Sequence, residues 1–154
     1  MGGVAGHAGL FSTAVDLSVF ARAMLNGGTA PACLPPGDGG EPCPVARAQS
    51  RALFDPVVLR AFTARYDGTS SRALGWDTPS EASSAGDYFT ALAFGHTGFT
   101  GTSLWMDPEL DLWVVLLTNR VHPTRENSRI VPLRRAVHDA AALAITDRPV
   151  ERRP

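Results

Sequence analysis

The feature that most restricts the fold of this chain is an almost unbroken apolar run at residues 112–118, Leu-Trp-Val-Val-Leu-Leu-Thr. A strand with one face in water alternates apolar and polar residues. An apolar run without alternation is typical of a strand that is covered on both faces. We therefore expect residues 112–118 to form a strand in a sheet that has helices on both sides.

The first of these helices is expected near the start of the chain. From Leu17 to residue 25 the apolar residues recur at the spacing of one helical face. Thr13 and Asp16 have the pattern of an N-cap and an acidic third residue, and the helix dipole favours a negative charge there. Residues 26–28, Asn-Gly-Gly, tolerate the left-handed conformation that commonly ends a helix.

Two further helices are expected in the rest of the chain. A short one covers residues 56–64, and a longer one begins at Pro132, because proline is favoured in the first position of a helix. The apolar residues of this last helix predict the stripe that it buries, which is Leu133, Ala136, Val137, Ala140, Ala141 and Ala144.

The remaining segments predict strands and loops. Extended segments are expected at residues 73–77, 88–96 and 102–106, with turn chemistry at residues 107–111 and a polar loop at residues 78–87. Hairpins followed by a terminal helix predict an α+β fold with an antiparallel sheet and flanking helices. A length of 154 residues suits one domain, residues 1–154.

Residues 29–50 are expected to be an inserted surface loop, because they are rich in proline and glycine and have no periodicity. Cys33 and Cys43 lie in this loop, at a spacing that fits no zinc pattern. A disulfide that closes the loop and two unrelated free thiols are equally compatible with the sequence.

The charged residues exclude several classes of function. All 14 basic residues are arginine, and 15 acidic residues leave a formal net charge of −1, so no strong positive field would attract nucleic acid. The absence of lysine excludes a lysine general base, a Schiff base and a phosphate-loop lysine. Arginine cannot replace lysine as a base because it stays protonated. No apolar run is long enough to span a membrane.

Other familiar motifs are absent as well. The glycines at positions 3, 6 and 9 do not have the spacing of a dinucleotide-binding loop, and no serine lies in a G-x-S-x-G elbow. The four histidines lack the spacing of a metal site, so we expect neither a metal nor a cofactor. For His122 and His138 we expect structural roles.

The tripeptide His96-Thr97-Gly98 is the strongest candidate for a functional site. It places two polar side chains at the end of an aromatic segment, followed by a glycine that a substrate could approach closely. Taken alone, such a tripeptide is also compatible with an ordinary surface turn. The residues around it favour the functional interpretation.

Two blocks of the sequence resemble the serine β-lactamase-related family, which includes class C β-lactamases, penicillin-binding proteins, D-alanyl-D-alanine carboxypeptidases and related esterases. The first block is Gly-Gly-Val-Ala-Gly-His-Ala-Gly-Leu-Phe-Ser-Thr at residues 2–13 with the helix that follows it, as far as Leu-Asn-Gly-Gly at residues 25–28. The second is Phe-Gly-His-Thr-Gly-Phe-Thr-Gly-Thr-Ser-Leu-Trp at residues 94–105, with Asp-Pro-Glu at 107–109 and Leu-Leu-Thr-Asn-Arg at 116–120. Residues 121–127 look typical of one branch of the family.

The resemblance implies a site and a fold. His96, Thr97 and Gly98 match the family's third active-site motif, Lys/His-Thr/Ser-Gly, on the strand that borders the cleft. By this resemblance, Thr97 binds the substrate's carboxylate or carbonyl, His96 supplies polarity or charge, and the Phe99 N–H is one oxyanion donor. The expected substrate is a small amide, peptide or ester. The implied fold is a partial β-lactamase-like sandwich without its N-terminal strands, so that residues 112–118 have an open edge.

The family's first two motifs, Ser-x-x-Lys and Tyr-x-Asn, have no counterpart in these 154 residues. Both motifs precede the first matching block in relatives. We therefore expect the chain to be the C-terminal portion of a serine hydrolase, with no nucleophile or base of its own and no activity alone. The alternative is a non-catalytic binding or interaction remnant of the same fold.

Overall fold

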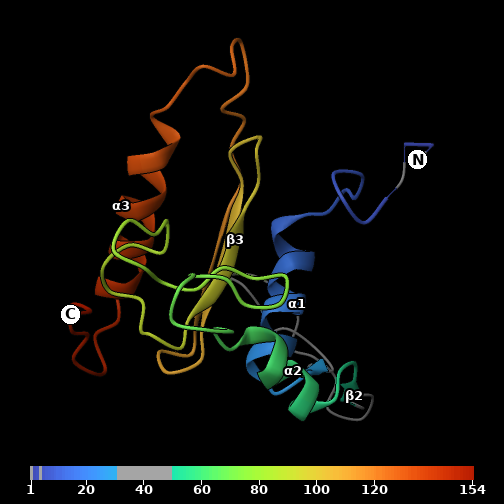
Figure 1. Cartoon of the computed structure of the whole chain (residues 1–154), viewed down its shortest axis with the longest axis vertical. Helices are drawn as coiled ribbons and strands as arrows, with labels where there is room; N and C mark the ends of the chain where they lie inside the picture. Colours follow the sequence, from blue (N-terminus) through green and yellow to red (C-terminus); the bar gives the residue numbers. More distant parts are fainter. Residues whose placement is uncertain (1, 4, 31–49) are drawn as a thin grey trace, which may run out of the picture.

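The computed structural model describes residues 2–3, 5–30 and 50–154. Its larger sheet is antiparallel, in the order β3-β4-β5, from strands Phe94–Thr97, Ser103–Asp107 and Leu112–Leu116. Helix α1 (Ala14–Leu25) and helix α3 (Ile130–Leu143) lie on opposite sides of this sheet, which is seen nearly edge-on in Figure 1. A short helix, α2 (Pro56–Thr63), packs near the end of α1. The described residues therefore have an α+β fold.

Each face of the sheet carries its own apolar core, because neighbouring residues of a strand point to opposite faces. On β4, Trp105 points into the core on the α3 side, while Leu104 and Met106 point into the core on the α1 side. The buried members on the α3 side are Ala85, Phe89, Ala93, Trp105, Leu110 and Ala142. Those on the α1 side are Ala21, Met24, Leu59, Phe94 and Met106.

The two N-terminal helices begin as their capping residues predict. The Thr13 hydroxyl accepts a hydrogen bond from the Asp16 backbone N–H at 3.1 Å, and Asn26 caps the other end of α1. Asp55 caps α2 by accepting from the N–H groups of Val57 and Val58, an N-cap that the sequence analysis did not single out. The expected extents of both helices are confirmed within two or three residues.

The prediction that residues 112–118 are covered on both faces is only partly right. Helices do lie on both sides of the sheet, but β5 pairs with β4 alone in the described part of the chain. Every residue of β5 keeps intermediate exposure as a result. An edge strand loses the lateral cover that a second neighbouring strand would give, so helices on its two faces do not bury it completely.

Two of the predicted strands are wrong in extent. Residues 73–77 form a tight turn between the bridged residues Arg72 and Asp77, in which Gly75 has a φ of +82°. The segment expected at 88–96 becomes a strand only at Phe94, because residues 90–93 turn and the Ala93 N–H donates to the Thr90 carbonyl at 3.2 Å. Asp77 joins β3 by exchanging two backbone hydrogen bonds with Gly95, at 2.7 and 2.9 Å.

The predicted buried stripe of the last helix is also wrong. Helix α3 begins at Ile130, two residues before Pro132, and its buried residues are Ile130, Arg134, His138 and Ala142. Leu133, Ala136, Ala140 and Ala144 are exposed instead, while Val137 and Ala141 are half-buried. The side chains of Arg134 and His138 face inward because backbone carbonyls accept their hydrogen bonds, those of Gly98 and Thr102 from Arg134 and that of Ser84 from His138.

The expected loop at residues 29–50 begins differently from the prediction. Thr29 and Ala30 form a short strand, β1 (Thr29–Ala30), that pairs antiparallel with β2 (Arg51–Ala52). The rest of the predicted insertion, with Cys33 and Cys43, lies outside the described residues.

Candidate active site

The candidate motif lies where β3 ends and turns into β4. His96 and Thr97 are the last residues of β3 and stand opposite Leu104 and Ser103 of β4. The turn between the strands is closed by two hydrogen bonds, from the Gly98 N–H to the Thr102 carbonyl at 2.8 Å and from the Gly101 N–H to the Gly98 carbonyl at 3.1 Å. The hairpin thus holds the motif and the following Phe99 at one end of the sheet.

His96 is exposed, and its two ring nitrogens have different partners. A guanidinium nitrogen of Arg72 lies 3.1 Å from Nε2, and the Thr97 carbonyl oxygen lies 2.9 Å from Nδ1. Arginine only donates and a carbonyl only accepts, so Nε2 is the acceptor and Nδ1 carries the proton. The His96 ring is therefore held between the Arg72 guanidinium and the Thr97 carbonyl.

Thr97 and Gly98 line a cavity of about 360 Å³ at this end of the sheet, together with Arg120, Asn127 and Arg134. Thr97 is half-buried, and its hydroxyl forms no hydrogen bond within the described residues. A Cβ at position 98 would meet the Thr102 hydroxyl, so a larger residue there would displace the Thr102 side chain. Among the described residues, Thr97 thus brings a hydroxyl without a hydrogen-bond partner to the lining of this cavity.

Phe99 follows the motif directly, and its backbone N–H has no acceptor among residues 2–3, 5–30 and 50–154. Its ring is 66% exposed and packs under the Arg120 guanidinium, 4.5 Å from the ring centre. Arg120 also donates from Nε to the Phe99 carbonyl oxygen at 2.7 Å. Arg120 thus contacts both the ring and the carbonyl of the residue whose N–H has no acceptor in the described part of the chain.

Arg134 is the residue at this site that the sequence analysis missed. It is 8% exposed and donates from one guanidinium nitrogen to the Gly98 carbonyl at 2.7 Å and to the Thr102 carbonyl at 2.8 Å. Burial lowers the pKa of Arg134, and the nearby positive charge of Arg120 lowers that pKa further. The only signal in the sequence was the four-residue spacing of Ile130, Arg134 and His138 on one helical face.

The expected structural role of His138 is confirmed. Its side chain is fully buried on α3, its Nδ1 lies 2.6 Å from the Ser84 carbonyl oxygen, and its ring packs edge-on against Phe89. Its other ring nitrogen has no partner among the described residues. Burial lowers the pKa of His138 below the ordinary value of 6.5, although the Ser84 hydrogen bond and Asp139 oppose this shift.

This lowered pKa predicts that acid destabilises the fold through His138. The unfolded chain takes up the proton as the pH falls through 6.5, whereas the folded chain resists it, so stability is lost below that pH. We expect the urea midpoint to fall between about pH 7.5 and about pH 5.5. The fall should be clearly smaller in His138→Gln and unchanged in His122→Gln, which alters an exposed histidine. An equal fall in all three proteins would contradict this role.

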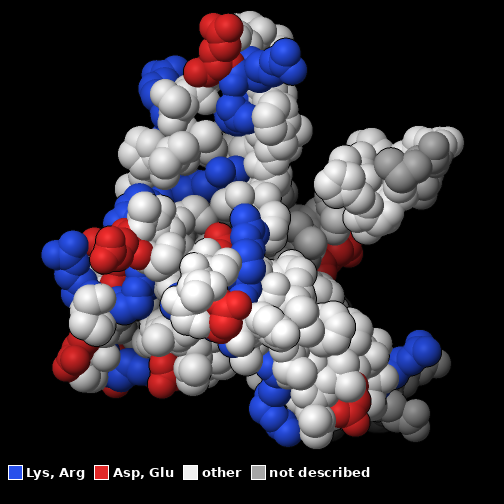
Figure 2. All heavy atoms as spheres, in the orientation of Figure 1, with Lys and Arg blue, Asp and Glu red and all other residues white. Residues whose placement is uncertain are grey.

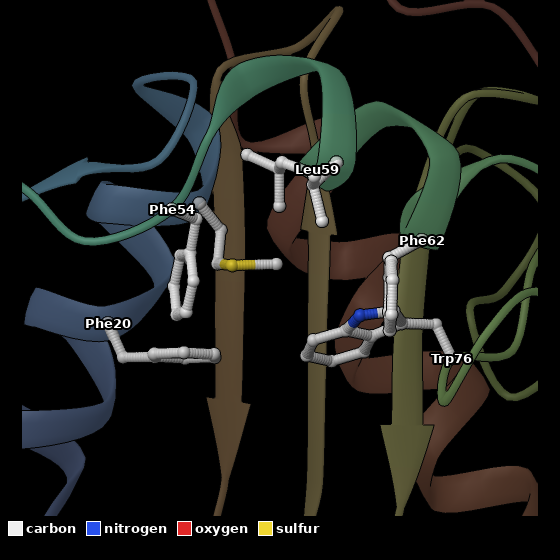
Figure 3. A pocket seen from close by; sticks show the side chains of 7 residues that line it. Phe20, Phe54, Leu59, Phe62 and Trp76 are labelled. Atoms are coloured by element: carbon white, nitrogen blue, oxygen red, sulfur yellow. The ribbon is translucent and has the colours of Figure 1, made fainter.

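A second cavity, of about 300 Å³, lies on the other side of the sheet, between α1 and α2. Its lining is almost entirely apolar, and Figure 3 shows Phe20, Phe54, Leu59, Phe62 and Trp76 around it. Phe20 stacks on Trp76 with ring centres 6.3 Å apart. The residues that line this cavity include no acid, base or nucleophile.

The described residues show no group of three or more His, Cys, Asp and Glu side chains arranged to hold a metal ion. None of the helices in the same residues is long and apolar enough to cross a membrane. Arginine and acidic side chains lie intermixed on the face of the molecule seen in Figure 2.

Comparison with known proteins decides the family. The sequence model of the beta-lactamase family matches residues 1–139, which include both helix α1 and the His96-Thr97-Gly98 hairpin. The chain belongs to the beta-lactamase family. The resemblance seen in the sequence is thereby confirmed. No solved structure matches the chain significantly.

Relatives of this beta-lactamase-family chain are found in Salmonella paratyphi B, Salmonella newport and Salmonella heidelberg. Each is 36% identical over 135 residues, and each is provisionally named a D-alanyl-D-alanine carboxypeptidase. The match covers 86% of this chain and 27% of each relative, so the chain spans little more than a quarter of their length.

Proposed function

We propose that this chain forms the substrate-binding wall of a serine hydrolase that cleaves an amide or ester bond through an acyl-enzyme. The observation that carries the proposal is the end of β3, where the free Thr97 hydroxyl and the free Phe99 N–H adjoin one cavity. In the proposed site, Thr97 donates to the substrate's carboxylate or carbonyl, and Phe99 donates to the oxygen that becomes negative in the tetrahedral intermediate.

The nucleophile and the base come, in this proposal, from another part of a longer protein. A serine oxygen forms a bond to the substrate carbonyl carbon, and its proton leaves with the departing amine or alcohol. Water then breaks the new ester bond, which releases the acid and restores the serine. These steps need a Ser-x-x-Lys motif, which this lysine-free chain does not contain.

Exposed apolar surface supports the idea that more protein packs on this chain. Phe11 is 98% exposed and Leu10 is 74% exposed, on an N-terminal segment that Figure 2 shows as a projection with almost no charged side chains. Val131, Leu133 and Leu143 of α3 are also about half exposed, and within residues 2–3, 5–30 and 50–154 no second strand pairs with β5. Surfaces of this kind are covered in stable proteins, here by the rest of the hydrolase.

The relatives' name suggests the substrate class. We infer that the intact protein acts on peptides that end in D-alanyl-D-alanine, or on esters or β-lactams that acylate the same serine. The Thr97 hydroxyl and the Arg120 guanidinium suit a substrate that carries a carboxylate.

Mass spectrometry of the full-length protein tests this proposal. After incubation with a β-lactam and with an activated ester, we expect one covalent adduct on the serine of its Ser-x-x-Lys motif. The 154-residue chain alone should acquire no adduct, and neither should the full-length protein after that serine is changed to alanine. A full-length protein that binds these compounds without acylation would contradict the proposal and favour a non-catalytic binding protein.

A further inference from the structure

The Arg134 side chain crosses behind the turn that carries the proposed oxyanion donor. One of its guanidinium nitrogens bonds both the Gly98 carbonyl at 2.7 Å and the Thr102 carbonyl at 2.8 Å. The same two carbonyls accept the turn's own hydrogen bonds, from the N–H groups of Gly101 and Gly98. Arg134 therefore links Gly98 and Thr102, the two residues between which the chain reverses direction.

The bond to Gly98 has a direct consequence for Phe99. The Gly98 carbonyl and the Phe99 N–H belong to one peptide group, which is planar and trans, so the two bonds point in opposite directions. A donor that fixes the direction of the C=O therefore fixes the direction of the N–H. A positively charged donor on the oxygen also draws electrons from the peptide group and makes its N–H a stronger donor.

The charge of Arg134 is not neutralised nearby. No carboxylate lies within 4 Å of its guanidinium in the described part of the chain, and its Nε has no hydrogen-bond partner there. Arginine remains protonated even where burial lowers its pKa. A full positive charge thus lies on the side of the peptide group opposite to the N–H that faces the substrate.

We propose that Arg134 is a positioning residue for the oxyanion hole, which orients and polarises the Phe99 N–H through the Gly98 carbonyl. This inference rests on the proposed function, since the donor acts only when a tetrahedral oxygen is present. Arg134 itself does not touch the reacting atoms.

The first test measures the peptide group itself by NMR, in the full-length protein without substrate. In Arg134→Gln we expect upfield shifts of the Gly98 carbonyl carbon and the Phe99 amide nitrogen and proton. Arg134→Lys, which keeps the charge, should shift these signals less. The matched control is Arg153→Gln, because Arg153 also donates to three backbone carbonyls, those of Ser80, Gly86 and Phe89, away from the turn. The proposal would be overturned if the chemical shifts of Gly98 and Phe99 in Arg134→Gln were the same as those in Arg153→Gln.

The second test measures acylation by an ester substrate in the full-length protein. We expect Arg134→Gln to lower the acylation rate constant about 10- to 100-fold with little change in KM, less than the 10²–10³-fold loss of a whole donor. Arg134→Lys should recover part of the rate, and Arg153→Gln should keep the wild-type rate. A raised KM with an unchanged rate constant would overturn the proposal, because Arg134 would then bind substrate directly.

The two tests separate this inference from the function on which it rests. If the wild-type full-length protein is not acylated at all, the proposed function fails, while the NMR shifts still report on the peptide group. If the wild-type protein is acylated and Arg134→Gln reacts as fast as Arg153→Gln, only the role of Arg134 fails.

Discussion

The change of Phe99 to proline in the full-length protein is expected to lower the rate of acylation about 10²–10³-fold. Proline has no N–H, so this variant removes the proposed oxyanion donor and little else. The Phe99 N–H has no acceptor among the described residues, so the hairpin loses no hydrogen bond of its own. Stopped-flow measurement of acyl-enzyme formation with an activated ester gives the rate.

Phe99→Ala is the matched control, because it removes the ring and keeps the N–H. The ring is largely exposed and contacts Arg120, so its loss should change the acylation rate by less than about tenfold. The urea midpoints of both variants should lie close to that of the wild type. If Phe99→Pro folds normally and is acylated as fast as Phe99→Ala, the Phe99 N–H is not an oxyanion donor.

The largest expected loss of stability follows removal of the Asp107 carboxylate. Asp107 is fully buried at the end of β4 and accepts hydrogen bonds from the Thr90 N–H at 2.6 Å, the Thr90 hydroxyl at 3.0 Å, the Glu109 N–H at 2.9 Å and the Leu110 N–H at 3.1 Å. Each buried donor left without an acceptor costs about 1–3 kcal/mol. Asp107→Ala should therefore lower the free energy of unfolding by about 3–5 kcal/mol.

Urea denaturation measures this loss, and two further variants serve as an intermediate case and a control. Asp107→Asn keeps one acceptor oxygen and should lie between Asp107→Ala and the wild type. Glu109→Ala changes an exposed side chain two residues away and should alter the free energy of unfolding by less than about 0.5 kcal/mol. A loss below about 1 kcal/mol for Asp107→Ala would contradict the proposed role of this carboxylate.

The elements that the sequence predicted well are those specified by local chemistry. Thr13 and Asp16 cap α1 as expected, and residues 26–28 end it, because capping involves residues a few positions apart. The turn at residues 107–111 and the strand at Ser103–Asp107 also follow from neighbouring residues. The position of His96-Thr97-Gly98 at the end of a strand was likewise predicted from neighbouring residues.

The residues that the sequence could not place depend on partners far along the chain. The sequence analysis did not single out Arg134 and expected only an unspecified structural role for His138, while a stripe of leucine, valine and alanine was expected inside. Their inward orientation follows from the carbonyls of Gly98, Thr102 and Ser84, which are 32 to 54 residues away. Asp107 likewise accepts from Thr90, 17 residues earlier. The residues next to Arg134, His138 and Asp107 in the sequence do not predict these distant acceptors and donors.

A crystal structure of the full-length protein, with a boronic acid or β-lactam bound covalently to its active-site serine, tests the central claim most directly. The account predicts that the oxygen of the adduct lies about 2.7–3.1 Å from the Phe99 backbone nitrogen, with a polar group of the compound on the Thr97 hydroxyl. An adduct whose oxygen accepts hydrogen bonds from other donors, with the end of β3 facing away from it, would contradict the account.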